Sequence, residues 1–96
     1  MYKVQEIKEL LFPILKKYNV KSAILFGSVA KNHATDKSDV DILVNSGLKG
    51  IAFYGLLEDV VEKLNTRVDL IDTSQIEPMS RIDQEIKNTG ILIYGQ

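Results

Sequence analysis

The 96-residue sequence contains no cysteine and no tryptophan, and it has only one histidine and two prolines. Without cysteine the chain forms no disulfide and no thiolate-based zinc or iron–sulfur site. An excess of basic residues is also missing, since the formal net charge is −1. We therefore expect no basic surface of the kind that binds nucleic acid directly.

Long apolar runs are missing as well. The sequence has neither an N-terminal hydrophobic signal nor a run of membrane-spanning length, so we interpret the chain as complete, soluble and cytoplasmic, with no membrane partner. Its length predicts a single domain over residues 1–96. A domain of this size buries only about 60–65% of the surface that its unfolded chain exposes, so docking to a partner protein would add to a modest stability.

Three segments carry apolar residues at the three-to-four spacing of an amphipathic helix. We predict helices over residues 2–18, 51–65 and 79–90. Pro13 should bend or split the first helix, because it lacks a backbone donor, and Asn19 is a plausible stop. Ser74 or Ser80 should cap the last helix, and Gly90 should end it.

Short apolar runs bounded by turn-forming residues predict strands over 22–27, 39–44 and 67–72. Residues 91–95 form either a last strand or a packed extension. The connection between the first two strands is too short for a helical crossover, so they should pair antiparallel or hold one helical turn between them. The predicted fold class is α/β (α+β), a small mixed sheet of three to four strands backed by helices.

Two aspartates, Asp39 and Asp41, stand at the start of the second predicted strand. Residues i and i+2 of a strand point to the same face, so the two carboxylates repel each other unless a cation neutralises them. Oxygen ligands of this kind suit Mg²⁺. If the strand over 67–72 is a neighbour, Asp69 brings a third carboxylate to the site. Taken alone, Asp39 and Asp41 could equally be a solvated pair, and Asp72 should face the other side of its strand.

A small-residue corner, Gly27-Ser28, ends the first predicted strand. Glycine lets a ligand approach the backbone closely, and the following turn presents amide groups and a hydroxyl to an anion. Ser28 could also simply cap a helix. Phosphate held at this corner and metal held by the aspartates are the equipment of metal-assisted phosphoryl or nucleotidyl transfer.

The segment "GSVAKNHATDKSDVDILV" resembles the G-S-x10-D-x-D signature of DNA polymerase β-type nucleotidyltransferases. By length and element order, the whole chain resembles the minimal nucleotidyltransferases (MNT) of prokaryotes. The resemblance implies that Gly27 and Ser28 bind the triphosphate of ATP and that Asp39 and Asp41 hold two Mg²⁺ ions. It also implies that Asp69 completes one metal site and activates the acceptor hydroxyl.

Many MNT proteins are encoded beside a HEPN-domain protein, and the resemblance implies that this chain is the antitoxin of such a pair. In that role it would transfer AMP from ATP to a tyrosine of the HEPN toxin and silence it. The family often has G-S-R-A-R-G at the corner, whereas this chain has Val29 and Asn32 in place of the first arginine and the last glycine. Lys31 keeps the positive charge of the second arginine, without its two-pronged geometry, and is the expected third contact to the triphosphate.

Two alternatives remain open at this point. The acceptor could be a small hydroxylated molecule, as in the aminoglycoside nucleotidyltransferases, although those generally carry an additional domain. The protein could also be a non-catalytic antitoxin that neutralises its toxin by binding. Among the remaining residues, we expect Ser38 to serve a turn and His33 to be an ordinary loop residue. Phe53 and Tyr54 should pack the core or a partner rather than form a nucleobase shelf.

Overall fold

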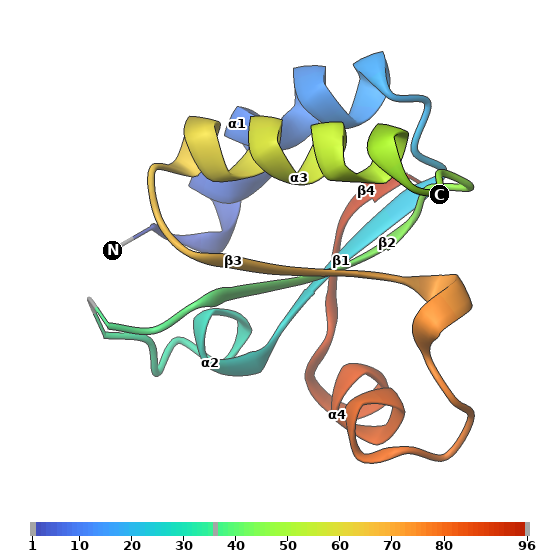
Figure 1. The fold of residues 1–96 in the computed structure, drawn as a ribbon. Coiled ribbons are helices and arrows are strands. Elements are labelled where there is room, and N and C mark those ends of the chain that lie inside the picture. The colour runs from blue at the N-terminus through green and yellow to red at the C-terminus, as the bar shows by residue number, and fades with distance from the viewer. Residues whose placement is uncertain (1, 36, 96) are drawn as a thin grey trace.

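The computed structural model describes residues 2–35 and 37–95 of the chain. Helices and strands alternate along the sequence (Figure 1). The elements are α1 Val4–Lys17, β1 Ser22–Phe26, α2 Gly27–Ala30, β2 Val40–Asn45, α3 Ile51–Leu64, β3 Val68–Asp72, a 3-10 turn η1 Thr73–Gln75, α4 Arg81–Thr89 and β4 Ile91–Gly95. The predicted helices and strands are confirmed, with boundaries that differ by one or two residues.

The four strands form one mixed sheet in the order β3-β2-β1-β4. Strand β1 pairs antiparallel with β2 and with β4, while β2 and β3 are parallel. The parallel pair is joined by helix α3, the crossover that a parallel connection requires. Both alternatives for the first connection hold, because β1 and β2 are antiparallel and the single turn of α2 lies between them. Residues 91–95 are a strand and not a packed extension.

The helix ends show which local signals the chain uses. Pro13 lies inside α1 without splitting it, so that part of the prediction is wrong. The buried Leu11 and Leu15 on either side hold the helix against the sheet, which offsets one missing backbone hydrogen bond. Asn19 adopts the left-handed conformation just after α1, with φ of 55°. Ser80, and not Ser74, caps α4 by accepting a hydrogen bond from the Asp83 amide.

The two faces of the sheet are covered differently. Helices α1 and α3 lie together on one face, whereas the short α2 and α4 lie on the other (Figure 1). The α1 and α3 face carries the hydrophobic core, which contains Ile7, Leu11, Leu15, Ala23, Leu25, Val40, Ile42, Val44, Leu56, Val60 and Leu64. Since side chains alternate along β2, Asp41 points to the opposite face, that of α2 and α4. Over the described part of the chain, no helix has both the length and the hydrophobicity to cross a membrane.

Candidate active site

The candidate site begins with two aspartates on neighbouring parallel strands. Asp41 of β2 and Asp69 of β3 are partners in the β2–β3 register. Partners in register place their side chains on the same face of a sheet and close to each other. The structure therefore brings Asp69 beside Asp41, as the sequence predicts for neighbouring strands.

The electrostatics of Asp41 reflect this crowding. Burial raises the pKa of its carboxyl from 3.8 to about 6, and the negative charges of Asp69, Asp39 and Glu85 add to that rise. Four carboxylates thus lie near one another. Asp41 belongs to β2, Asp39 precedes that strand, Asp69 belongs to β3 and Glu85 belongs to α4. Such a concentration of negative charge favours either a proton or a cation.

Glycine at position 27 allows this cluster to form beside the end of β1. Gly27 is buried at the start of α2 and has φ of 75°, a conformation that other residues adopt only with strain. A Cβ atom placed on Gly27 would clash with Asp41 Oδ2. The backbone of Gly27 therefore lies directly against the Asp41 carboxylate, and only glycine leaves room for it there.

The rest of the predicted phosphate contact lies on α2 and just after it. Ser28 is the second residue of α2, and its carbonyl accepts a hydrogen bond from the His33 amide. Lys31 follows α2 and pairs with Glu85 of α4, with Nζ 3.7 Å from Oε1. This ion pair ties the corner to the helix that also contributes negative charge at Asp41. Both partners are partly exposed, so the pair opens at little cost.

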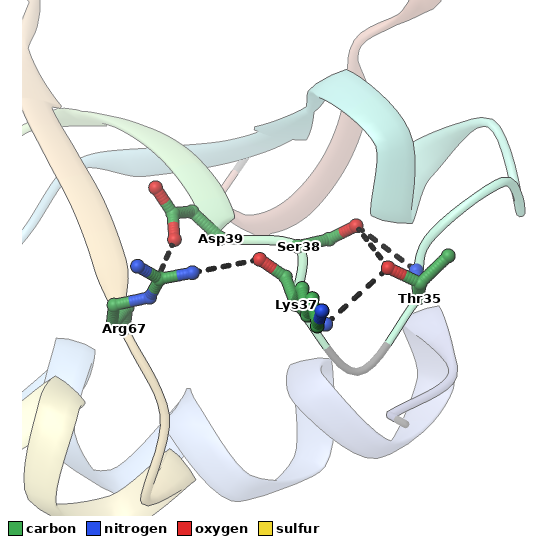
Figure 2. A network of polar contacts seen from close by, with 5 residues as sticks. All are labelled: Thr35, Lys37, Ser38, Asp39 and Arg67. Carbon is green, nitrogen blue, oxygen red and sulfur yellow. Dashed lines mark hydrogen bonds and ion pairs between the residues drawn. The ribbon is translucent and has the colours of Figure 1, made fainter.

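Asp39 forms an ion pair in this structure. Its Oδ1 lies 3.0 Å from Nε of Arg67, and the Arg67 side chain also donates to the carbonyl of Lys37 at 2.7 Å (Figure 2). In the same turn the Ser38 hydroxyl accepts a hydrogen bond from the Thr35 amide at 2.9 Å. The turn role of Ser38 is thus confirmed, and the carboxylate of Asp39 pairs with the guanidinium group of Arg67, the residue just before β3.

The donor set suits a divalent cation. Carboxylate oxygens are the ligands that Mg²⁺ prefers, and Mg²⁺ commonly takes its remaining ligands from water and substrate phosphates. Within residues 2–35 and 37–95, however, no three His, Cys, Asp or Glu side chains are arranged as a ready metal site. Asp41 and Asp69 lie side by side, but Asp39 faces Arg67. A full set of three ligands thus requires Asp39 to turn from Arg67 toward the other two.

Two residues near the site were not anticipated from the sequence. Arg67 stands two residues before Asp69, and strand alternation alone could have placed both on one face. Glu85 could not have been found in this way, because its position depends on how α4 packs against β1 and α2. A nucleobase shelf formed by Phe53 and Tyr54 is ruled out as a feature of this site, since α3 covers the opposite face of the sheet (Figure 1).

A second buried carboxylate lies at the other end of the β2–β3 pair. Asp72 accepts hydrogen bonds from the amide and hydroxyl of Ser46, at 3.0 and 2.6 Å, and from those of Ser74, also at 3.0 and 2.6 Å. Burial alone would raise its pKa, but these donors outweigh that effect and lower it to about 2. As predicted, Asp72 faces away from Asp69. Its hydrogen bonds to Ser46 and Ser74 indicate a structural role.

Sequence comparisons agree with this geometry. The family model described as "Polymerase beta, Nucleotidyltransferase" matches residues 7–96. Two relatives from Methanocaldococcus jannaschii, each provisionally assigned as a protein adenylyltransferase, are 38% identical over 79 residues and 40% identical over 85 residues. Both alignments cover 79% of this chain and 84% of the relative.

Solved structures share the fold. A crystal structure of a toxin–antitoxin with AMP-PNP contains a chain that matches with a TM-score of 0.79 and 24% identity, over 93% of this chain and 73% of that one. A complex of tri-AMPylated Shewanella oneidensis HEPN toxin with MNT antitoxin gives a TM-score of 0.73 at 23% identity, over 97% and 73% of the two chains. A provisionally assigned minimal nucleotidyltransferase gives 0.74 at 21% identity, over 95% and 96%. At these identities the likeness establishes the fold.

Proposed function

Because the chain belongs to the polymerase beta nucleotidyltransferase family, we propose that it is a magnesium-dependent protein adenylyltransferase. It transfers AMP from ATP to a hydroxyl, a tyrosine in the leading case, of a HEPN-type toxin, and it thereby acts as the antitoxin. The reaction takes place in the cytoplasm, where ATP and toxin are both present. The proposal extends to a single functional domain over residues 1–96.

One observation carries the proposal. Asp41 and Asp69 are in register on parallel strands, and the backbone of Gly27 lies against Asp41. Among the described residues no cationic side chain pairs with Asp41 or Asp69, and the Gly27-Ser28 corner of backbone lies beside them. A nucleotide with its divalent cation supplies what both features need, since the cation neutralises the carboxylates and the phosphates meet the corner.

Each residue has a role in this proposal. Gly27 and Ser28 hold the triphosphate through backbone amides and the serine hydroxyl, and Lys31 adds a positive charge once it leaves Glu85. Asp39 and Asp41 hold two Mg²⁺ ions, with Asp69 completing one of the two sites. When bound, the ions lower the pKa of the attacking hydroxyl and neutralise charge on the departing pyrophosphate.

The bond changes are those of a single displacement. The acceptor oxygen forms a bond to the α-phosphorus of ATP, and the bond between that phosphorus and the β-phosphate oxygen breaks. Pyrophosphate leaves, and AMP stays on the acceptor. Asp69 takes the hydroxyl proton, because it is the most exposed carboxylate on the strands and therefore the nearest to an incoming acceptor. Holding the reacting groups in line is the main contribution of the other residues.

The acceptor and the antitoxin role rest on similarity. The M. jannaschii relatives are assigned as protein adenylyltransferases, and the S. oneidensis complex pairs an MNT antitoxin with an AMPylated HEPN toxin. The chain also spans most of each relative, so its catalytic equipment is of comparable extent. A protein acceptor that brings its own surface suits a site whose carboxylates Asp39 and Asp69 are exposed better than a small molecule does.

The test is a transfer assay with the product of the neighbouring gene. The purified protein is incubated with that product, ATP and Mg²⁺, and AMP is located on the partner by intact-mass and peptide mass spectrometry. We expect AMP on a partner tyrosine, and no transfer by an Asp41→Ala, Asp69→Ala variant or in EDTA.

Other outcomes would replace the proposal. Tight complex formation without transfer, together with full neutralisation of the toxin by the Asp41→Ala, Asp69→Ala variant, would establish a binding antitoxin instead. AMP found only on an added aminoglycoside would establish a small-molecule transferase. Both results differ from simple inactivity, because each has its own positive readout.

A further inference from the structure

Arg67 is the cationic side chain that pairs with Asp39 in this structure. Its Nε donates to Asp39 Oδ1 at 3.0 Å and its Nη2 donates to the carbonyl of Lys37 at 2.7 Å, so one guanidinium group, from the residue just before β3, holds two groups of the turn before β2 (Figure 2). The backbone of Arg67 is fixed too, because its carbonyl accepts the Val40 amide at 3.0 Å. Asp39 is thus drawn toward the strand that also carries Asp69.

The carboxylate of Asp39 has two possible positively charged partners, a bound cation and Arg67. The proposed reaction requires its carboxylate at a cation beside Asp41, whereas the structure shows it on the guanidinium of Arg67. The two arrangements exclude each other at the Oδ1 atom, and the absence of a ready three-ligand site in the described residues agrees with the second one. A divalent cation that binds through this atom therefore exchanges one positive charge for another at Asp39.

We propose that Arg67 is a positioning residue that holds Asp39 until the metal–nucleotide complex arrives and then releases it. This inference rests on the proposed function, since it concerns the same metal site. The side chain of Arg67 is 74% exposed and that of Asp39 is 49% exposed. An ion pair this exposed is weak, so a divalent cation displaces it readily. The guanidinium keeps its anchor on the Lys37 carbonyl and neutralises the carboxylate when the site is empty of ligand.

Nuclear magnetic resonance can observe the exchange directly, because the chain has only two arginines, Arg67 and Arg81. The full-length protein labelled uniformly with ¹⁵N gives two arginine Nε–H resonances, with Arg81 as the internal reference. We expect the Arg67 resonance to shift when Mg²⁺ and α,β-methylene-ATP are added, but not when the nucleotide is added with EDTA. Asp39→Asn without ligand should reproduce that shift.

The outcomes separate this inference from the proposed function. If backbone amides of residues 27, 28 and 41 respond to Mg²⁺ and nucleotide while the Arg67 resonance stays in place, the exchange does not occur and the inference is wrong. If none of these amides responds, no nucleotide binds at this corner, and the proposed function fails with the inference.

A second measurement uses cation affinity. Mn²⁺ binding in the presence of α,β-methylene-ATP is followed by electron paramagnetic resonance for Arg67→Met and for the matched control Lys37→Met. The control removes one positive charge from the same turn but keeps the carbonyl that Arg67 contacts. We expect Arg67→Met to bind Mn²⁺ about two- to fivefold more tightly than the control, the range that an exposed ion pair supplies. Equal or weaker binding by Arg67→Met would overturn the exchange.

Discussion

A carboxylate lies at each end of the β2–β3 strand pair, and the surroundings of the two carboxylates shift their pKa values in opposite directions. At one end Asp72 accepts four hydrogen bonds from Ser46 and Ser74, and its pKa falls to about 2. At the other end Asp41 lies among carboxylates, and its pKa rises to about 6. The first carboxylate is satisfied by its own protein. The second favours a proton or a cation, which is the property that the proposed active site needs and that the structural carboxylate lacks.

The largest effect should come from removing the carboxylates of the unsatisfied end. Asp41→Ala or Asp69→Ala should lower AMP transfer by about 10²–10³-fold or more, because the cations lose their protein ligands. Asp59→Asn is the control, since Asp59 pairs with Lys17 on the other side of the sheet. Initial rates of transfer at saturating ATP measure the effect. Comparable losses in all three variants would show that the loss of transfer is not specific to the Asp41 and Asp69 carboxylates.

Removing Asp72 should act on stability and not on catalysis. Asp72→Ala leaves the buried donors of Ser46 and the more exposed donors of Ser74 without an acceptor, and it should lower the free energy of unfolding by about 2–4 kcal/mol. Urea denaturation measures the loss, and the transfer rate per folded molecule should stay close to that of the wild type. A stable Asp72→Ala protein with impaired transfer would mean that Asp72 belongs to the active site.

The Gly27 contact can be isolated with a second glycine. Gly27 and Gly47 both have positive φ, 75° and 70°, but a Cβ on Gly47 meets no atom within 4 Å whereas one on Gly27 meets Asp41. Both Gly→Ala variants should cost about 1–2 kcal/mol of stability from backbone strain. Only Gly27→Ala should also lower AMP transfer, by about ten- to a hundredfold, because it displaces the Asp41 carboxylate.

The result that would contradict this reasoning is an equal effect of the two glycine variants on transfer. In that case the loss would come from strain alone, and the close approach of Gly27 to Asp41 would have no catalytic consequence.

The smallest effect is a pH dependence of opposite sign at the two ends. The folded pKa of Asp41, about 6, lies above the ordinary value of 3.8, so its contribution to stability is present at low pH and is lost as the pH rises through about 6. Without Mg²⁺, Asp41→Asn should therefore be about 1 kcal/mol more stable than the wild type at pH 8, a figure reduced for solvent screening, and no more stable at pH 4.

Asp72 should show the opposite trend. Its pKa is lowered from 3.8 to about 2, so it contributes stability above pH 3.8 that is lost as the pH falls toward 2.

Thermal unfolding between pH 4 and pH 8 measures both trends. A wild type that gains stability relative to Asp41→Asn as the pH rises would show that the Asp41 carboxylate is already compensated within the protein. Adding Mg²⁺ and a nucleotide analogue at pH 8 should reverse the order of the two proteins, because only the wild type can bind the cation fully.

Much of this arrangement could be predicted from the sequence. The alternation of strand residues and the short run from Asp39 to Asp41 predict a shared face, and a helical connection to the next strand predicts the parallel pairing that sets Asp69 beside Asp41. The corner at Gly27 could also be predicted, because a Gly-Ser pair directly follows the apolar run of β1. These features depend on backbone geometry over short distances, which the sequence determines well.

Side-chain partners could not be predicted in the same way. The Arg67–Asp39 pair depends on rotamers of two exposed side chains, and Glu85 reaches Asp41 only because α4 packs across the sheet. The uninterrupted α1 at Pro13 likewise reflects packing that outweighs a local preference. Asp72 looked unremarkable in the sequence because its donors, Ser46 and Ser74, lie on two different connections.

The most direct test of the account is a crystal structure of the protein with Mn²⁺ and α,β-methylene-ATP, with the ions located by anomalous scattering. We predict anomalous density between Asp41 and Asp69, the triphosphate on the backbone of Gly27 and Ser28, and Asp39 turned from Arg67 toward the ions. Nucleotide bound elsewhere, or bound at Gly27 and Ser28 with no ion beside Asp41 and Asp69, would contradict the claim that this cluster is built to hold a metal–nucleotide complex.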